Sequence, residues 1–76
     1  MLLCLALIEG ETASADAIRS VSLGNAKQLV VGTAYGFGIV VHIAAESRED
    51  LDRALRDFTQ VKGVTGVLTM ALRAQP

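Results

Sequence analysis

The pattern of apolar and polar positions is most regular between Gly36 and Gly63. It opens with a continuous apolar run at residues 37–45, which predicts a buried strand. After the turn Glu46-Ser47, apolar residues return with the spacing of one helix face. These residues are Leu51, Ala54, Leu55, Phe58 and Val61. This stretch therefore predicts a strand followed by an amphipathic helix.

The ends of this helix are marked by capping residues. Ser47 can accept a hydrogen bond from the first free amides, and Asp50 three residues later completes a capping-box pattern. Glu49 and Asp50 fall in the first turn, where the helix dipole favours negative charge. Gly63 supplies the left-handed residue that commonly ends a helix, so the helix is predicted to stop there.

A first strand is predicted at residues 2–8, which are apolar at consecutive positions rather than alternately. A strand of this kind usually has both faces covered. The helices of the chain can cover one face, so we expect a second subunit to cover the other.

The next elements have weaker patterns. A polar break at residues 9–11 precedes a short helix, for which Thr12 is the expected N-cap and Gly24-Asn25 the expected stop. The apolar side of this helix is expected to hold Ser14, Ala17, Ile18 and Val21. Residues 27–31 predict a second strand, joined to the strand at 37–45 by a hairpin loop at residues 32–36.

The last strand is predicted at residues 64–73. One face is expected to hold Leu68, Met70 and Leu72, and the other Val67, Thr69 and Ala71. The order is then strand, helix, strand, strand, helix, strand in one domain, residues 1–76. With two right-handed strand–helix–strand crossovers, this order predicts an α+β, ferredoxin-like fold. In this fold a four-stranded antiparallel sheet has both helices on one face. The opposite face would be bare in a monomer, which predicts a homodimer or a higher homo-oligomer.

The composition supports self-association and excludes several classes of partner. Apolar residues make up 51% of the 76 residues, more than a lone small core can hide. The net charge is −1 and Lys and Arg do not cluster, so we expect no direct contact with nucleic acid. Residues 2–8 are too short to span a membrane and lack the flanks of a signal peptide. Cys4 is the only cysteine, which indicates a buried, inert thiol and a cytoplasmic, reducing location.

The sequence contains few groups that could carry catalysis. The loop at residues 32–36 is glycine-rich, but it lacks a phosphate-binding motif; it is interpreted as a hairpin turn, with a small-ligand loop as the alternative. His42 is the only histidine and no partner lies at metal-ligand spacing, so it is interpreted as a half-buried or interface residue. Asp52 and Arg56 are spaced for an ion pair on a solvated helix face. We therefore expect no catalytic residue, metal, cofactor or enzyme activity.

Three short motifs carry a resemblance to a known family. They are Gly32-Thr33-Ala34-Tyr35-Gly36 before an apolar strand, Ala44-Ala45-Glu46-Ser47-Arg48-Glu49-Asp50-Leu51, and Val61-Lys62-Gly63-Val64 leading to Leu68-Thr69-Met70. In these motifs the chain from Val31 onwards resembles the ligand-binding (RAM) domain of the feast/famine (Lrp/AsnC) transcription regulators.

The resemblance implies a dimeric α/β barrel, in which the sheets of two subunits pack face to face. It also implies a small, amino-acid-like effector near the hairpin loop, where the loops of neighbouring subunits approach each other. The ligand-binding residues would be Gly32, Thr33, Tyr35, Gly36 and Thr69. Tyr35 would supply a ring and a hydroxyl, and amides around the glycines would face a carboxylate. Gly36 stands where the family has a loop aspartate, so we expect weak or altered amino-acid binding. The sequence has no helix-turn-helix pattern, so a full-length regulator is an expected partner.

Two other functions also fit the sequence. The small chaperone of periplasmic nitrate reductase has the same fold and binds a twin-arginine signal peptide along its sheet edge. Its final strand resembles Leu-Val-Tyr-His, where this chain has Thr69-Met70-Ala71-Leu72. A purely structural oligomerisation module also fits the composition. A hairpin loop without a concave site in the oligomer would indicate the third function rather than the first.

Overall fold

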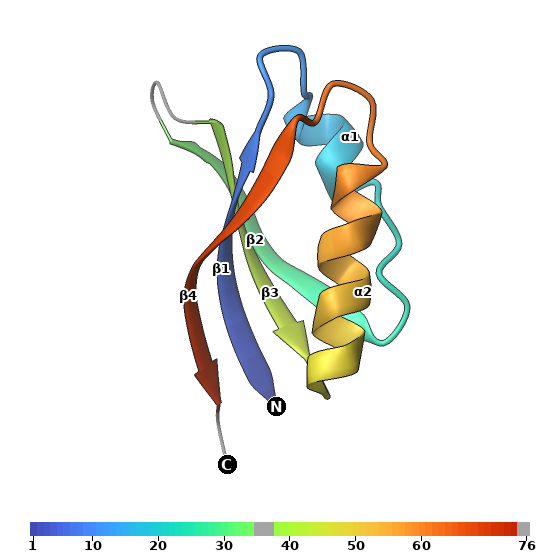
Figure 1. Cartoon of the computed structure of the whole chain (residues 1–76), viewed down its shortest axis with the longest axis vertical. Helices are drawn as coiled ribbons and strands as arrows, with labels where there is room; N and C mark the ends of the chain where they lie inside the picture. The colour runs from blue at the N-terminus through green and yellow to red at the C-terminus, as the bar shows by residue number, and fades with distance from the viewer. Residues whose placement is uncertain (35–37, 75–76) are drawn as a thin grey trace.

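The computed structural model describes residues 1–34 and 38–74. Its elements follow the predicted order (Figure 1). They are β1 (Leu2–Glu9), α1 (Ala15–Arg19), β2 (Ala26–Ala34), β3 (Gly38–Ala45), α2 (Arg48–Thr59) and β4 (Gly66–Ala74).

The four strands form one antiparallel sheet in the order β2-β3-β1-β4. Both helices lie on the same side of this sheet (Figure 1). The predicted α+β, ferredoxin-like fold is therefore confirmed. β2 and β4 are the edge strands, and no element among the described residues covers the side of the sheet away from the helices. We call this side the uncovered face.

The core lies between the sheet and the helices. Alternate residues of the two central strands are buried on the helix side, and α2 packs its apolar face against them. The buried residues between the central strands and α2 include Cys4, Ala6 and Ile8 in β1, Ile39, Val41 and Ile43 in β3, and Leu51, Ala54 and Phe58 in α2. Ile18, Leu23 and Ala26 extend this core toward α1 and the start of β2. This confirms the predicted phase of α2, with Leu55 and Val61 at the margin of the core.

Helix α2 begins as its capping residues predict. The Oγ atom of Ser47 accepts a hydrogen bond from the Asp50 amide at 3.1 Å, and Glu49 and Asp50 occupy the first turn. The helix ends at Thr59 with Gln60 as its C-cap, three residues before Gly63. Gly63 has a φ of +91°, which favours glycine, so it belongs to the turn that follows the helix.

Replacing Ser47 with alanine should lower the free energy of unfolding by about 1 kcal/mol, because an Asp50 amide loses its hydrogen-bond acceptor. Urea denaturation followed by circular dichroism measures the change. Ser22→Ala is the matched control, since Ser22 is exposed and lies outside both helices. Equal effects of the two substitutions would contradict the capping role of Ser47.

Helix α1 is shorter than the sequence predicts. Its N-cap is Ser14 rather than Thr12, and it ends at Arg19, well before Gly24. The Gln28 Nε2 atom donates to the carbonyls of Ile18 at 2.8 Å and Val21 at 3.4 Å. Carbonyl groups at a helix end lack partners within the helix, and here a side chain from the neighbouring strand β2 donates to them. The helix can therefore end early.

Strand β2 is longer than predicted and includes Gly32, Thr33 and Ala34, which the sequence analysis assigned to the hairpin loop. The antiparallel pairing of Ala34 with Gly38 confirms the hairpin itself. Tyr35, Gly36 and Phe37 lie outside the described residues, as does the predicted tail at residues 75–76.

Strand β4 contains a bulge that its alternation of residues does not predict. Leu5 pairs with Ala71, but Ala6 pairs with Thr69, so Met70 has no partner in β1. Directly paired residues point to the same side of a sheet. Leu68 therefore shares the uncovered face with Leu7, whereas Leu72, paired with Cys4, lies on the opposite side. The prediction that Leu68, Met70 and Leu72 share one face is wrong because the extra residue reverses the alternation.

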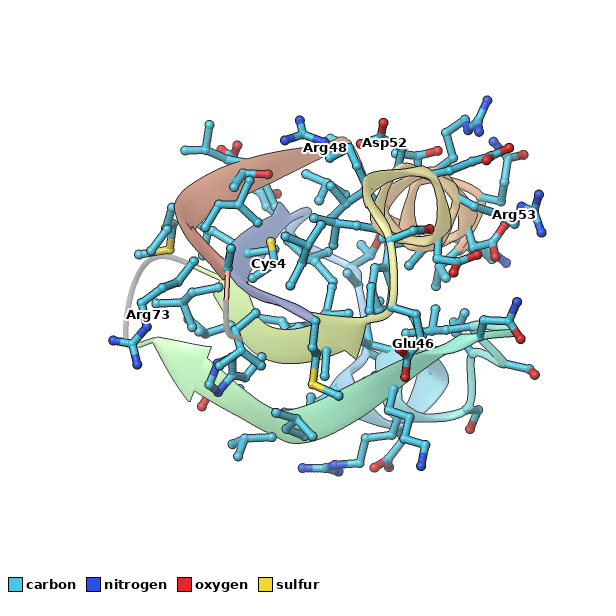
Figure 2. All side chains as sticks on the ribbon, turned by 90° about the horizontal axis from the view of Figure 1, so that it is seen from below. Cys4, Glu46, Arg48, Asp52, Arg53 and Arg73 are labelled. Atoms are coloured by element: carbon cyan, nitrogen blue, oxygen red, sulfur yellow. The ribbon has the colours of Figure 1, made fainter. Side chains whose placement is uncertain are left out.

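The surface ion pairs differ in detail from those predicted. Arg48 Nε contacts Asp52 Oδ1 at 3.1 Å on the exposed surface of α2 (Figure 2). The expected pair between Asp52 and Arg56 is not formed in the part of the chain that the structure describes. Arg48 and Asp52 are more than half exposed, so their pair contributes little to stability.

Candidate functional site

An open depression of about 870 Å³ lies at the hairpin end of the sheet. Three parts of the chain form it: the β1–α1 loop, the α2–β4 loop, and the ends of β2 and β3 that face the hairpin. In Figure 1 they lie together at the upper end of the molecule. The lining residues are Glu9, Gly10, Glu11, Thr12, Ala13, Thr33, Gly38, Ile39, Gly63 and Thr65. We call this the hairpin-end depression.

Close backbone packing fixes the two loops relative to each other. The Thr65 amide donates to the Glu9 carbonyl at 2.8 Å, which extends the pairing of β1 and β4. A Cβ atom at Gly10 would lie 2.0 Å from the Gly63 carbonyl oxygen, so a residue with a side chain would push the loops apart. The φ of Gly10 is +151°, which also favours glycine. The walls of the depression are therefore positioned before any ligand binds.

The polar groups of the depression are hydroxyls and carboxylates. Thr12, Thr33 and Thr65 can each donate or accept a hydrogen bond, and the Glu11 carboxylate accepts. Glu9 also borders the depression, but its Oε1 atom lies beside Gly66, 3.6 Å from the position of an added Cβ. No Lys or Arg side chain lines the depression among the described residues. Such a site suits a ligand that carries an amino group or several hydroxyls.

The structure places only part of the predicted ligand-binding set in this depression. Thr33 lines it and is exposed, whereas Gly32 is adjacent in β2 and pairs with Val40 on the uncovered face. A Cβ built at Gly32 would meet no atom within 4 Å, so its backbone is open to approach. Tyr35 and Gly36, also predicted, lie outside the described residues.

Thr69 is not brought to this depression within one chain. It lies on β4, whereas Thr33 lies on β2, and these strands are the two opposite edges of the sheet. Three strand spacings of about 4.8 Å separate the edges. Thr69 could join Thr33 in one site only across an assembly of subunits.

Thr69 instead lies close to the buried Cys4 thiol. Burial raises the pKa of Cys4, while a hydrogen bond with Thr69 and the positive charge of Arg48 oppose the rise. Cys4 is fully buried between the sheet and α2 (Figure 2). A buried thiol with a raised pKa is protonated at neutral pH and reacts poorly. Cys4 therefore acts as a packing residue, in agreement with the prediction of a buried thiol.

The residues of the β1–α1 and α2–β4 loops that line the depression were not predicted from the sequence. Glu11 and Thr12 lie next to Gly63 and Thr65 in space but more than fifty positions away in sequence. No local motif marks them. The predicted topology could have found them, because the end of the first strand must lie beside the start of the last in an antiparallel pair.

The described residues contain neither a metal-binding cluster nor a membrane-spanning helix. Within residues 1–34 and 38–74, no three His, Cys, Asp or Glu side chains gather closely enough to hold a metal ion. Neither helix in that part of the chain has the length and apolar character needed to cross a bilayer.

In comparisons with known proteins, the chain matched no family model, no curated protein and no solved structure.

Proposed function

We propose that this chain is a non-enzymatic, cytoplasmic module that binds a small, amino-acid-like effector and self-associates through its uncovered face. One observation carries the effector-binding part. The hairpin-end depression combines the Thr33 hydroxyl, predicted as a ligand contact, with the Glu11 carboxylate from a different loop. A carboxylate and several hydroxyls around one hollow are the groups that recognise an ammonium group.

Glu11 supplies a group that the hairpin loop itself lacks. Gly36 stands where the resembling regulators have an aspartate, so the loop offers no carboxylate to a ligand's amino group. Glu11 lines the same depression as Thr33 and can take that role. The ligand carboxylate would then face the backbone amides around Gly32 and Gly36, with Tyr35 beside it, as the resemblance implies.

The composition of the sheet supports self-association. The side of β1 that faces away from the helices carries Leu3, Leu5 and Leu7, which a monomer leaves only half-buried. A second copy placed face to face would complete a dimeric α/β barrel. The resemblance adds a regulator with its own DNA-binding domain as a further partner, without direct contact between this module and nucleic acid.

The edges of the sheet argue against the signal-peptide chaperone function. Both edge strands are interrupted by a bulge, at Leu29 in β2 and at Met70 in β4. A bulge breaks the row of backbone groups that an added peptide strand would use. Lys27 and Arg73 on the uncovered face would also repel a twin-arginine peptide. A purely structural oligomerisation module remains the second candidate, because it needs only the uncovered face.

Calorimetric titration with the twenty amino acids tests the effector proposal. We expect at least one amino acid to bind, and Glu11→Gln and Thr33→Val each to weaken its binding, Glu11→Gln by about tenfold or more because a charged hydrogen bond is lost. Tyr35→Ala should weaken it as well. The matched control is Glu46→Gln, an exposed glutamate outside the depression.

Two results would overturn this proposal. Tight binding that survives Glu11→Gln, Thr33→Val and Tyr35→Ala would place the effector elsewhere on the molecule. Absence of binding for all twenty amino acids would leave the structural oligomerisation function as the better explanation.

A further inference from the structure

The register of the sheet defines how side chains are arranged on the uncovered face. Directly paired residues of the four strands form three successive rows across it. From β2 to β4 the rows are Lys27, Ala44, Leu3 and Arg73; then Val30, His42, Leu5 and Ala71; then Gly32, Val40, Leu7 and Leu68. The centre of the face is therefore apolar except for His42, and its cations stand at one end.

The opposite end of the uncovered face carries an anion. Glu9 follows Leu7 in the alternation of β1 and pairs with Gly66 of β4. Its Oε1 atom lies beside Gly66, where no side chain blocks it. Arg73 projects from the side of the sheet away from α2 (Figure 2). Glu9 and Arg73 are both exposed, and neither forms an ion pair with another described residue.

The face, rather than an edge, is suited to a second copy of the chain. The bulges at Leu29 and Met70 interrupt both edges. Four strands about 4.8 Å apart, with about 3.4 Å per residue along an eight-residue strand, give each face roughly 500 Å². Two such faces together bury roughly 1,000 Å², the area at which specific interfaces begin.

The charges on the face distinguish the two simple ways of stacking it on itself. A twofold axis parallel to the strands places β2 over the partner's β4, so Lys27 meets Arg73 of the partner subunit twice. A twofold axis perpendicular to the strands reverses strand direction and keeps β4 over β4. Arg73 then lies over the end of the face that carries Gly66, one strand spacing from Glu9 of the partner subunit.

We propose that two copies stack their uncovered faces with the strands antiparallel, so that Glu9 of each copy pairs with Arg73 of the other. This inference rests on the proposed self-association and specifies its geometry. The twofold axis passes near Leu5, Leu7, Val40 and His42, which become the buried centre of the interface. The two symmetric ion pairs lie at the two ends of the stacked β4 strands, and they determine the direction in which the sheets stack.

Charge exchange tests the arrangement in the full chain. Dimer dissociation constants are measured by sedimentation equilibrium for the wild type, Glu9→Arg, Arg73→Glu and the double variant that carries both changes. Each single variant should dimerise about tenfold more weakly or worse, because like charges meet at two symmetric positions. The double variant restores opposite charges and should return to within about threefold of the wild type.

Lys27→Glu is the matched control. Lys27 shares a row with Arg73 but stands on β2, far from Glu9 of the partner subunit in the antiparallel arrangement, so its reversal should leave the dissociation constant within about threefold of the wild type. In the parallel arrangement the same change would strengthen dimerisation, because the introduced carboxylate would meet Arg73 of the partner subunit.

The outcomes separate the geometry from the proposed function. Dimers that form equally well in all variants, or a double variant no stronger than the single ones, would overturn the antiparallel stacking while self-association stands. A wild-type protein that stays monomeric at micromolar concentration would overturn both. Effector binding is measured separately by calorimetry, so its result does not depend on this experiment.

Discussion

A Val41→Asp variant is expected to be unfolded. Val41 is fully buried on the helix side of β3, between Ala6 of β1 and Val31 of β2. A carboxylate at this point loses its hydration and meets no cation within the core, which contains no buried charged residue among those described. The loss should exceed about 4 kcal/mol, a large part of the stability of a small domain. Far-ultraviolet circular dichroism and thermal denaturation measure it.

Leu5→Asp is the matched control for this substitution. Leu5 lies on the neighbouring strand but on the opposite side of the sheet, where it pairs with His42 on the uncovered face. Its aspartate remains accessible to water in a monomer but not in the proposed dimer. The variant should therefore keep its circular dichroism spectrum and sediment as a monomer. A folded Val41→Asp, or a Leu5→Asp that dimerises like the wild type, would contradict the assigned sides of the sheet.

The most regular part of the sequence predicted its structure best, because its signals are local. The period of Leu51, Ala54 and Phe58 fixed the buried side of α2, and Ser47 fixed where the helix begins. The apolar run of β3 likewise became a central strand. Helix phase and capping depend on residues within one or two turns, so the sequence alone contains the necessary information.

The errors arose where distant residues decide the local structure. The side chain of Gln28, ten residues beyond Ile18, donates hydrogen bonds to the carbonyl groups at the end of α1. These bonds allow the helix to stop early. The bulge at Met70 depends on how β4 aligns with β1, and nothing in the alternation of β4 itself marks it. Register is a property of two strands together, so a pattern read along one strand misses it.

The residues predicted for ligand binding overlap only in part with the lining of the hairpin-end depression. Thr33 was identified through a resemblance in the hairpin region and does line the hairpin-end depression. Glu11 was treated as part of a polar break, because its relation to Thr33 exists only after the sheet has formed. Thr69 was assigned to the same site through the resemblance; within one chain it lies on the opposite edge of the sheet from Thr33, so only a neighbouring subunit could bring it there. Side chains gathered from separate loops leave no spacing signal in the sequence.

Replacing Phe58 with alanine should lower the free energy of unfolding by about 3–5 kcal/mol. Phe58 is fully buried and is the largest such side chain in the described core. It lies on the last full turn of α2 and packs in the cluster that joins the helix to β1 and β3. Its removal leaves a cavity that rigid strands on one side and the helix backbone on the other can close only partly.

Leu55→Ala is the matched control for Phe58→Ala, because both substitutions place alanine in the same helix. Leu55 is only partly buried at the margin of the core, so its truncation removes fewer contacts and leaves no closed cavity. We expect the free energy of unfolding to fall by only about 1–2 kcal/mol, estimated from the apolar area that the Leu55 side chain buries. Urea denaturation of both variants gives the two values. If Phe58→Ala and Ser47→Ala lowered the free energy of unfolding by equal small amounts, a different side of α2 would face the sheet.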